Sequence, residues 1–547
     1  MNDAVLPAAA PATELPLITS AELRRRLIAR EETALLDLRE EDPFAQAHPL
    51  WAANLPLSRI ELEAWRRMPR RDTLIVLYGE HEGEDLVPRG AAVLARLGYT
   101  QVHALAGGLQ GWADAGGELF RDVNVPSKSF GELVEHQRGT PSLAAQEVQA
   151  LLDAKADVVV LDVRRFDEYQ TMNIPGSTSV PGAELVLRAR ALAPDAATRV
   201  IVNCAGRTRS IIGTQSLVNA GLPNPVAALR NGTIGWLLAG QTLEHGADRR
   251  APAEVDADAL AHARTGAQRV AERAGVRTVD LQALPALDEP GRTLYRFDVR
   301  TPEEHAAGHL SGFASAPGGQ LVQETDHAVP VRGARIVLAD DDGVRAFMTA
   351  SWLAQMGWDV HVLTGATAAD HSDTAAALPD PPLPRAPVQG IAPAALASLL
   401  HAGDAVLIDV GASANYVKRH VPGAWFALRA QLPQALRVLP EAGQYVLTCG
   451  DCQLARHAAN DLRDWLDAQD RPAVGVRVLD GGNAAWFAAG LPTETGESRL
   501  ATPRTDRYRR PYEGTDAPRE AMQAYLDWEF GLVEQLGRDG THHFKVA

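Results

Sequence analysis

One loop of this sequence combines a cysteine with groups that activate a thiol. The loop follows the apolar run RVIVN and consists of Cys204, Ala205, Gly206, Arg207, Thr208, Arg209 and Ser210. At the start of a helix, such a loop can turn several backbone N–H groups toward one point, where an anion is stabilised. Because the thiolate is the nucleophilic form of cysteine, these amides and the two guanidinium groups should lower the thiol pKa. We therefore expect a reactive Cys204 whose surroundings also attract a small dianion.

The overall composition is that of an ordinary globular protein. The 547 residues are 46% hydrophobic and 22% charged. No apolar run approaches the roughly 18 residues that span a bilayer, and the Ala- and Pro-rich N-terminus does not resemble a signal peptide. A formal charge of -16 disfavours nucleic-acid binding. Three cysteines are too few for a disulfide framework, so we expect a cytoplasmic protein with reduced thiols and no membrane span.

An apolar strand that ends in aspartate occurs four times along the chain. Its copies are ALLD, VVVLD, LYRFD and AVLID, which end at Asp37, Asp162, Asp298 and Asp409. At nearly the same distance after each aspartate, a second apolar strand leads to Gly79, Cys204, Asp340 and Cys449. Amphipathic stretches follow, and this alternation is typical of α/β folds with mainly parallel sheets. Sites in such sheets lie beyond the carboxyl ends of the strands, where Cys204 and Cys449 fall.

These repeats divide the chain into four units and a tail. A segment with Gly and Trp closes three of the copies, at Trp112, Trp236 and Trp486, whereas the third copy ends after HVLTG. We place unit 1 at 14–122, unit 2 at 140–246, unit 3 at 271–368 and unit 4 at 388–497. A Pro-rich, semi-rigid spacer at 371–390 separates units 3 and 4. In the tail, 498–547, a helix over APREAMQAYLDWEFGLVEQLG should pack against one of the units.

The loop after Cys204 and the motifs around it resemble the rhodanese sulfurtransferase family. Unit 2 has an upstream DVR, an IPGS segment at 174–177 and a closing NGTIGW. The resemblance implies an α/β fold of four tandem rhodanese-like domains, each a mainly parallel sheet flanked by helices. It also implies a transferase of the thiosulfate sulfurtransferase type.

The resemblance further implies a persulfide mechanism. In that family, the loop cysteine takes the outer sulfur of thiosulfate or a related donor and passes it to cyanide or a thiol. On this pattern Cys204 is catalytic, and the substrate or persulfide charge is bound by Ala205, Gly206, Arg207, Thr208, Arg209 and Ser210. The implied partners are a small sulfur donor and a thiol or cyanide acceptor, with a protein as an alternative sulfur acceptor, and no cofactor or metal. A buried structural cysteine is the less favoured interpretation.

Units 1 and 3 have no thiol at the catalytic position. Gly79 and Asp340 stand there, so both units are expected to be inactive. The resulting order of silent and thiol-bearing units suggests two tandem pairs, in which each silent unit packs against the unit that follows it. The ADDDG run at 339–343 lacks the spacing of a calcium loop, and we interpret it as a solvated loop.

Other polar residues near the repeated motifs are interpreted as scaffold. Asp162 and Arg164 should form a structural ion pair, because the same pair recurs in units without a thiol. His309 and His420 are not catalytic candidates, because unit 2 has Asn173 at the corresponding position.

Unit 4 carries a second candidate site. Its loop, CGDCQLAR, has Cys449 at the catalytic position and Cys452 three residues later, but Asp451 follows where an arginine would be expected. The carboxylate should raise the thiol pKa and weaken anion binding. The pair is consistent with a second sulfur carrier, a regulatory disulfide or half of a metal site, or else with a degenerate domain. We favour a secondary sulfur-handling or redox loop.

Three classes of function remain for the whole chain. The leading hypothesis is a sulfurtransferase that uses a Cys204 persulfide. A non-catalytic protein for sulfur trafficking or scaffolding is the second, because only one of four loops is complete. A phosphatase or arsenate reductase is the third, because the Cys-(x)5-Arg loop of those enzymes also binds an oxyanion. Its spacing is missed by one residue here, since Ser210 occupies the arginine position and Arg209 precedes it.

Overall fold

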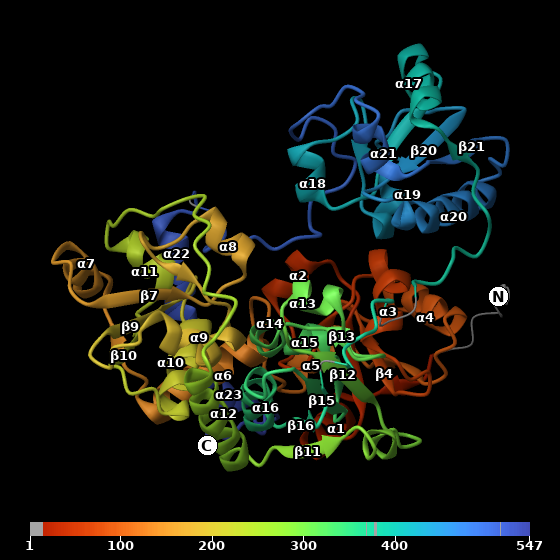
Figure 1. The fold of residues 1–547 in the computed structure, drawn as a ribbon. Coiled ribbons are helices and arrows are strands. Elements are labelled where there is room, and N and C mark those ends of the chain that lie inside the picture. The colour runs from red at the N-terminus through yellow and green to blue at the C-terminus, as the bar shows by residue number, and fades with distance from the viewer. Residues whose placement is uncertain (1–14, 368, 377–379, 515) are drawn as a thin grey trace.

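The computed structural model describes residues 15–367, 369–376, 380–514 and 516–547, which form four α/β units joined by helices and loops (Figure 1). Residues 14 and 368, the expected start of unit 1 and end of unit 3, lie outside the described residues, as does part of the Pro-rich spacer. Each unit contains one mainly parallel sheet flanked by helices. The predicted fold class is therefore confirmed.

The two strands that the repeats predict are neighbours in every unit. They pair in parallel as β2 (Thr33–Asp37) with β4 (Ile75–Tyr78), β7 (Val158–Asp162) with β9 (Arg199–Asn203), β12 (Leu294–Asp298) with β15 (Arg335–Ala339), and β18 (Val406–Asp409) with β20 (Gln444–Thr448). Val200, Ile201 and Val202 of β9 are fully buried, because helices cover both faces of a parallel sheet. The aspartate and the position of Cys204 or its counterpart thus lie side by side at the carboxyl ends of two adjacent strands in each unit.

Units 1 and 2 share the same order of elements. Unit 1 contains β1 (Leu17–Ile18), α1 (Ser20–Ala29), α2 (Glu41–Gln46), β3 (Ala53–Asn54), the 3-10 helix η1 (Leu57–Arg59), α3 (Ile60–Arg67), α4 (Leu86–Arg96), β5 (Val102–Leu105) and α5 (Gly108–Asp114). Unit 2 contains β6 (Ser142–Leu143), α7 (Ala145–Asp153), α8 (Phe166–Thr171), β8 (Thr178–Ser179), η2 (Gly182–Glu184), α9 (Leu185–Leu192), α10 (Thr208–Ala220), β10 (Val226–Leu229) and α11 (Gly232–Leu238). The sheet of unit 2 has the order β6-β10-β9-β7-β8.

Units 3 and 4 repeat this plan with local differences. Unit 3 contains β11 (Arg277–Asp280), η3 (Leu284–Leu287), α13 (Pro302–Ala307), β13 (Ala314–Ser315), α14 (Gly318–Gln323), α15 (Thr325–Ala328), β14 (Val331–Arg332), α16 (Arg345–Gln355) and β16 (Asp359–Thr364). Unit 4 contains β17 (Gly390–Ile391), α17 (Pro393–Ala402), α18 (Ser413–Lys418), β19 (Trp425–Phe426), η4 (Arg429–Gln431), α19 (Leu432–Ala435), α20 (Gln453–Ala468), β21 (Gly475–Leu479) and α21 (Gly482–Ala488). Among its described residues, unit 3 has no closing helix after β16, as the sequence predicts.

The units pair differently from the predicted order. Unit 2 packs on unit 3 through η2, α14 and α16, where Arg345 binds Glu184 at 2.8 Å. Unit 1 packs on unit 4 through η1 and η4, where Arg429 binds Glu61 at 2.6 Å. The prediction of pairs 1–2 and 3–4 is wrong, because long connecting segments let the same face of each unit meet a unit that is not the one predicted.

A common core and one shared strand join units 1 and 3. The strand β14, from the unit 3 segment of the chain, pairs in antiparallel with β2 and forms an edge of the unit 1 sheet. The largest hydrophobic cluster runs through units 1, 2 and 3, whereas unit 4 builds clusters of its own around residues such as Leu407 and Leu447. Figure 1 accordingly shows unit 4 as a separate lobe above the other three.

Among the described residues, four further helices lie in segments outside the four units. Between units, α6 (Val125–Arg138) precedes unit 2 and α12 (Ala257–Arg273) follows it. The tail forms two helices rather than the single one predicted, α22 (Arg519–Phe530) and α23 (Leu532–Asp539), separated by Gly531. As expected, the tail packs on the units: α22 contacts α11 of unit 2, and both tail helices contact α6.

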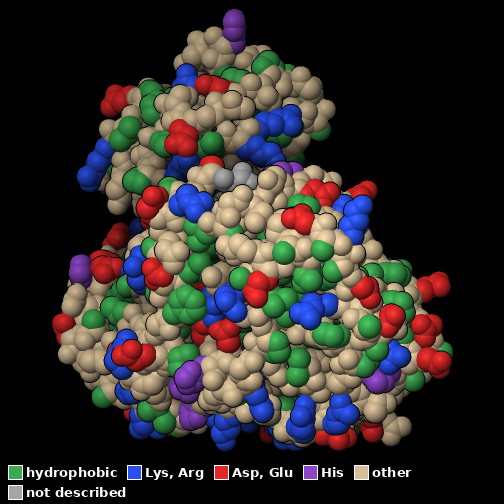
Figure 2. Space-filling view, turned by 90° about the vertical axis from the view of Figure 1, so that its left-hand side faces the viewer, with side chains coloured by type: hydrophobic (Ala, Val, Ile, Leu, Met, Phe, Trp, Pro, Cys, Tyr) green, Lys and Arg blue, Asp and Glu red, His purple; other side chains and the backbone are tan. Residues whose placement is uncertain are grey.

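The surface is mixed in charge. Figure 2 shows acidic and basic side chains interspersed over the face in view, including the lobe of unit 4. Within the described part of the chain, no helix is both long and apolar enough to cross a membrane.

Candidate active site

Cys204 lies directly after β9, in the loop that leads into α10. Its side chain is 1% exposed. The thiol donates a hydrogen bond to Oγ of Ser210 at 3.3 Å, and that hydroxyl donates to the carbonyl oxygen of Arg207 at 2.9 Å. Because α10 begins at Thr208, the thiol lies at the N-terminal end of the helix, as predicted.

Burial opposes the expected activation of this thiol. It raises the pKa of Cys204 above the ordinary value of a cysteine, while Arg209 and the hydrogen bonds with Ser210 act in the opposite direction. The expectation of a lowered pKa is therefore wrong for the conformation described, because the sequence could not show how completely the loop is covered.

The guanidinium group of Arg209 forms a repeated ion pair. It binds both carboxylate oxygens of Glu168 in α8, at 2.8 and 2.9 Å. Unit 3 contains the same arrangement, in which Arg345 binds both oxygens of Glu304 at 2.7 and 3.1 Å. Since unit 3 has no thiol, this pair belongs to the common scaffold of the units.

Arg207 is bound from outside unit 2. Its guanidinium group contacts both oxygens of Glu132 in α6, at 2.7 and 2.9 Å, and it also pairs with Glu135. It donates to Oδ1 of Asn231 at 3.0 Å and lies over the ring of Phe530, 4.2 Å from its centroid. Carboxylates thus bind both of the arginines that were expected to hold a substrate.

In unit 3, backbone N–H groups of the corresponding loop bind a carboxyl group. We call this set of N–H groups the backbone cradle. Asp340 occupies the position of Cys204 and accepts hydrogen bonds from the N–H groups of Gly343, Val344 and Ala346, at 3.1, 3.1 and 2.8 Å. Asp340 and Asp342 are buried, so the interpretation of ADDDG as a solvated loop is wrong for both. The N–H groups at the start of the helix bind the Asp340 carboxylate in place of water.

Unit 1 binds a different carboxylate in its loop, through other N–H groups. The oxygens of Glu84 accept from the N–H groups of Glu80 and His81 at 3.2 and 3.3 Å. A side chain at Gly79 would begin 2.6 Å from Oε2 of Glu84, so this carboxylate takes the place of the missing one. In both thiol-free units, therefore, N–H groups of the loop bind a carboxyl group supplied by the protein itself.

In unit 4, Cys449 occupies this cradle. Its sulfur accepts a hydrogen bond from the N–H group of Ala455 at 3.4 Å, the counterpart of the Ala346 contact in unit 3. Burial, with a smaller contribution from Asp451, raises the pKa of this thiol to about 11. Cys452 caps α20 in a left-handed conformation with φ of 70°, and all three cysteines are free thiols.

A metal site at Cys449 finds no support in the described part of the chain. No cluster of three or more His, Cys, Asp or Glu side chains suited to an ion occurs there. His457, the one nearby candidate in the sequence, instead lies at the interface with unit 1, where its Nδ1 is 3.9 Å from Oε1 of Glu61.

The scaffold interpretations agree with the contacts in the structure. Asp162 and Arg164 form a buried pair at 2.8 Å, and the counterparts Asp37–Arg39 and Asp298–Arg300 pair at 2.7 Å each. The three residues His309, His420 and Asn173 each bond the carbonyl oxygen four residues earlier. An asparagine can therefore replace the histidine, because either side chain reaches this carbonyl group.

The structure adds groups to the site that the sequence motifs did not indicate. A Cβ atom at Gly206 would lie 3.2 Å from Cε1 of Tyr525 and 3.5 Å from Oε2 of Glu529, both in α22. On another side, Thr208 packs against Gly131 of α6. These helices lie outside the repeats, and only the amphipathic pattern of the tail indicated that it docks.

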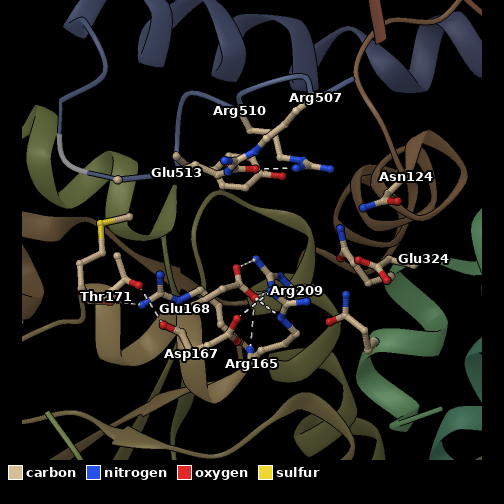
Figure 3. Close-up of a pocket in the computed structure, with 16 residues that line it drawn as sticks. Asn124, Arg165, Asp167, Glu168, Thr171, Arg209, Glu324, Arg507, Arg510 and Glu513 are labelled. Atoms are coloured by element: carbon tan, nitrogen blue, oxygen red, sulfur yellow. Dashed lines mark hydrogen bonds and ion pairs between the residues drawn. The ribbon is translucent and has the colours of Figure 1, made fainter. Parts of the chain in front are cut away.

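A cavity of about 400 Å³ opens beside Arg209, between unit 2, unit 3 and the tail. Figure 3 shows Arg507, Arg510 and Glu513 on one side of it, opposite Glu168 and Arg209. A second cavity, of about 320 Å³, reaches Gly411 and Leu454 beside the Cys449 loop. Both cavities are lined by Asn124, Glu324 and Arg510, so they adjoin at the tail.

Comparisons with known proteins agree with this architecture. A family model, the rhodanese-like domain, matches residues 19–115, 144–239, 282–372 and 392–489. The chain is similar to a crystal structure of thiosulfate sulfurtransferase from Pseudomonas aeruginosa, with 63% identity, coverage of 97% of this chain and 100% of that chain, and a TM-score of 0.93. The Alr3790 protein from Anabaena sp. is 24% identical over 20% of this chain and 84% of its own, with a TM-score of 0.18. A comparison with curated proteins gave no match.

Proposed function

Because the chain belongs to the rhodanese family, we propose that it is a sulfurtransferase that carries sulfane sulfur as a persulfide on Cys204. Four matched domains and the similarity to a thiosulfate sulfurtransferase along nearly the whole chain support this activity. The observation that carries the assignment to Cys204 is the backbone cradle. Its N–H groups bind the carboxyl group of Asp340 in unit 3, and in unit 2 the position of Asp340 holds a thiol.

In the first half-reaction, the thiolate of Cys204 attacks the outer sulfur of thiosulfate or a related donor. A new S–S bond forms on Cys204 while the S–S bond of thiosulfate breaks, and sulfite leaves with the electron pair of that bond. The product is the anionic persulfide of Cys204. The loop is suited to this anion, because the corresponding N–H groups of unit 3 bind a carboxylate.

In the second half-reaction, cyanide or a thiolate attacks the terminal sulfur of the persulfide. The S–S bond breaks, thiocyanate or a new persulfide leaves, and the thiolate of Cys204 is regenerated. Ser210 and Arg209 stabilise this thiolate, since both act to lower the pKa of Cys204. The guanidinium group of Arg209 therefore serves through its charge, while the N–H groups of Arg207, Thr208 and Ser210, the counterparts of the unit 3 donors, provide the direct contacts.

We assign Cys449 and Cys452 an accessory role in sulfur handling. The pKa of about 11 leaves little thiolate at Cys449 near neutral pH, so direct attack on thiosulfate should be slow there. The cavity beside its loop adjoins the cavity beside Arg209, which supports passage of sulfur from unit 2 to unit 4 on a small carrier.

Thiocyanate formation from thiosulfate and cyanide tests this proposal in full-length variants. We expect C204S to fall to the uncatalysed rate, because an alkoxide cannot replace the thiolate. The double variant C449S/C452S is the matched control and should retain activity within about twofold. If C204S retained activity, or if only the double variant lost activity, the reaction would have to be assigned to unit 4.

A further inference from the structure

The helix α22 brings a buried carboxyl group to the Cys204 loop. Glu529 is 1% exposed, and its Oε1 accepts a hydrogen bond from the hydroxyl of Tyr525 at 2.8 Å. Its Oε2 has no hydrogen-bond partner among the described residues. This unpartnered oxygen is the one that faces Gly206, two residues after the catalytic thiol.

The position of α22 is well fixed on unit 2. Met522, Tyr525 and Leu526 form a hydrophobic cluster with Ile234 of α11. At the start of the helix, Arg519 donates to the carbonyl oxygens of Leu237 and Leu238 at 3.2 and 2.6 Å. Glu529 is therefore held against the loop by the contacts that the preceding turns of α22 make with unit 2.

Charged and titratable groups face Glu529 from every element packed around it. They are Tyr525 on its own helix, Lys128 and Glu132 on α6, and Cys204 and Arg207 in the loop. Asp122, just before α6, and Tyr512 of the tail act on the neighbouring Tyr525. The nearest cations are already paired, since Lys128 binds Asp122 at 2.7 Å and Arg207 binds Glu132. An ionised Glu529 would thus lie beside the loop without a cation of its own.

We infer that Glu529 is a positioning residue that sets the charge at the Cys204 loop and thereby decides whether an anionic sulfur donor is accepted. Neutral Glu529 leaves the potential of the loop favourable to a thiolate, a persulfide or a donor with a sulfonate group. Ionised Glu529 opposes all three by like-charge repulsion. The inference rests on the proposed function, and it names the class of donor that the site distinguishes.

Burial and neighbouring charges support the neutral form. Burial, together with the charge of Glu132, raises the pKa of Glu529 to about 8. Near neutral pH the carboxyl group is therefore protonated, and it becomes ionised at mildly alkaline pH. The ionised form should in turn raise the pKa of Cys204, because the negative charge of Glu529 disfavours the thiolate.

Alkylation of Cys204 tests the inference independently of sulfur transfer. We would measure the rate at which iodoacetamide labels the Cys204 peptide of the full-length protein by mass spectrometry, between pH 6 and pH 10. The variant E529Q keeps the shape and the contact with Tyr525 but cannot ionise. We expect it to react like the wild type near pH 6 and about tenfold faster near pH 9, the effect of removing one nearby charge.

The matched control is D527N, which removes a carboxylate from the exposed face of the same helix. Its rates should follow those of the wild type at every pH. A ratio between E529Q and wild type that stays constant with pH would indicate a purely structural role and overturn the inference.

A second measurement uses the wild type alone and does not depend on the folding of a variant. The rate with the anion iodoacetate, divided by the rate with neutral iodoacetamide, should fall about tenfold as pH rises through 8. A ratio that is flat with pH would contradict the inference. Because neither reagent requires a persulfide, these results stand apart from any failure of the sulfurtransferase proposal itself.

Discussion

At the scale of single residues, the loop after the second repeated strand holds a different group in each unit. Unit 3 holds the carboxyl group of Asp340 and unit 1 that of Glu84, while units 2 and 4 hold the thiols of Cys204 and Cys449. A carboxylate needs no activation, but a buried thiol does, because burial alone raises its pKa. The surroundings of the thiol, including Glu529, therefore determine its reactivity.

Glu529 should also make the stability of the protein depend on pH. Its pKa in the folded protein is about 8, above the roughly 4.3 of an unfolded glutamate. The contribution of neutral Glu529 to the free energy of unfolding is complete at pH values below the pKa of the unfolded chain. It is lost as pH rises through 8, because the glutamate ionises more readily in the unfolded chain. We expect E529Q to exceed the wild type in Tm by more at pH 9 than at pH 5.

Thermal unfolding at the two pH values checks this expectation, with D527N as the control. Because Asp527 is exposed, that variant should differ from the wild type by the same small amount at both values. An E529Q difference that is equal at pH 5 and pH 9 would show that Glu529 does not change its ionisation on folding.

At the scale of elements, the repeated strands and loops and the docking of the tail were predictable, but the loop that the tail covers was not. The apolar runs ending at Asp162 and Cys204 indicate adjacent parallel strands, because burial on both faces requires such runs. The loop position of Cys204 followed directly from them. The pairing of Arg207 with Glu132 and the approach of Glu529 depend on helices far away in the chain, whose docking surfaces carry no local sequence signal.

The contacts of Arg519 should control how often α22 exposes the loop. This side chain bonds two carbonyl oxygens at the end of α11, and such charge-assisted bonds contribute about 1–2 kcal/mol. We expect R519A to increase the rate of iodoacetamide labelling at Cys204 about fivefold at every pH, in contrast to the pH-dependent effect of E529Q. E520Q, a change at the adjacent exposed position, is the control, and equal rates for R519A and E520Q would contradict a covering role for α22.

At the scale of the whole molecule, the pairing of units places the two thiol sites in different settings. Unit 2 shares the large core with units 1 and 3 and is covered by the tail, whereas unit 4 keeps its own core and meets unit 1 through Arg429 and Glu61. This arrangement could not be predicted from the sequence, because the contacts between units come from surface side chains rather than from the repeated motifs. The thiol-free units 1 and 3 thus form part of the framework that holds unit 2 and the tail together.

The most direct test of the account is the location of the transferred sulfur. The full-length protein would be treated with thiosulfate, digested without reductant, and its Cys204, Cys449 and Cys452 peptides compared by mass spectrometry. The account predicts the added mass of one sulfur atom on the Cys204 peptide, and its removal by cyanide. Sulfur that appears first on Cys449 or Cys452, or on no cysteine at all, would contradict the assignment of Cys204 as the persulfide carrier.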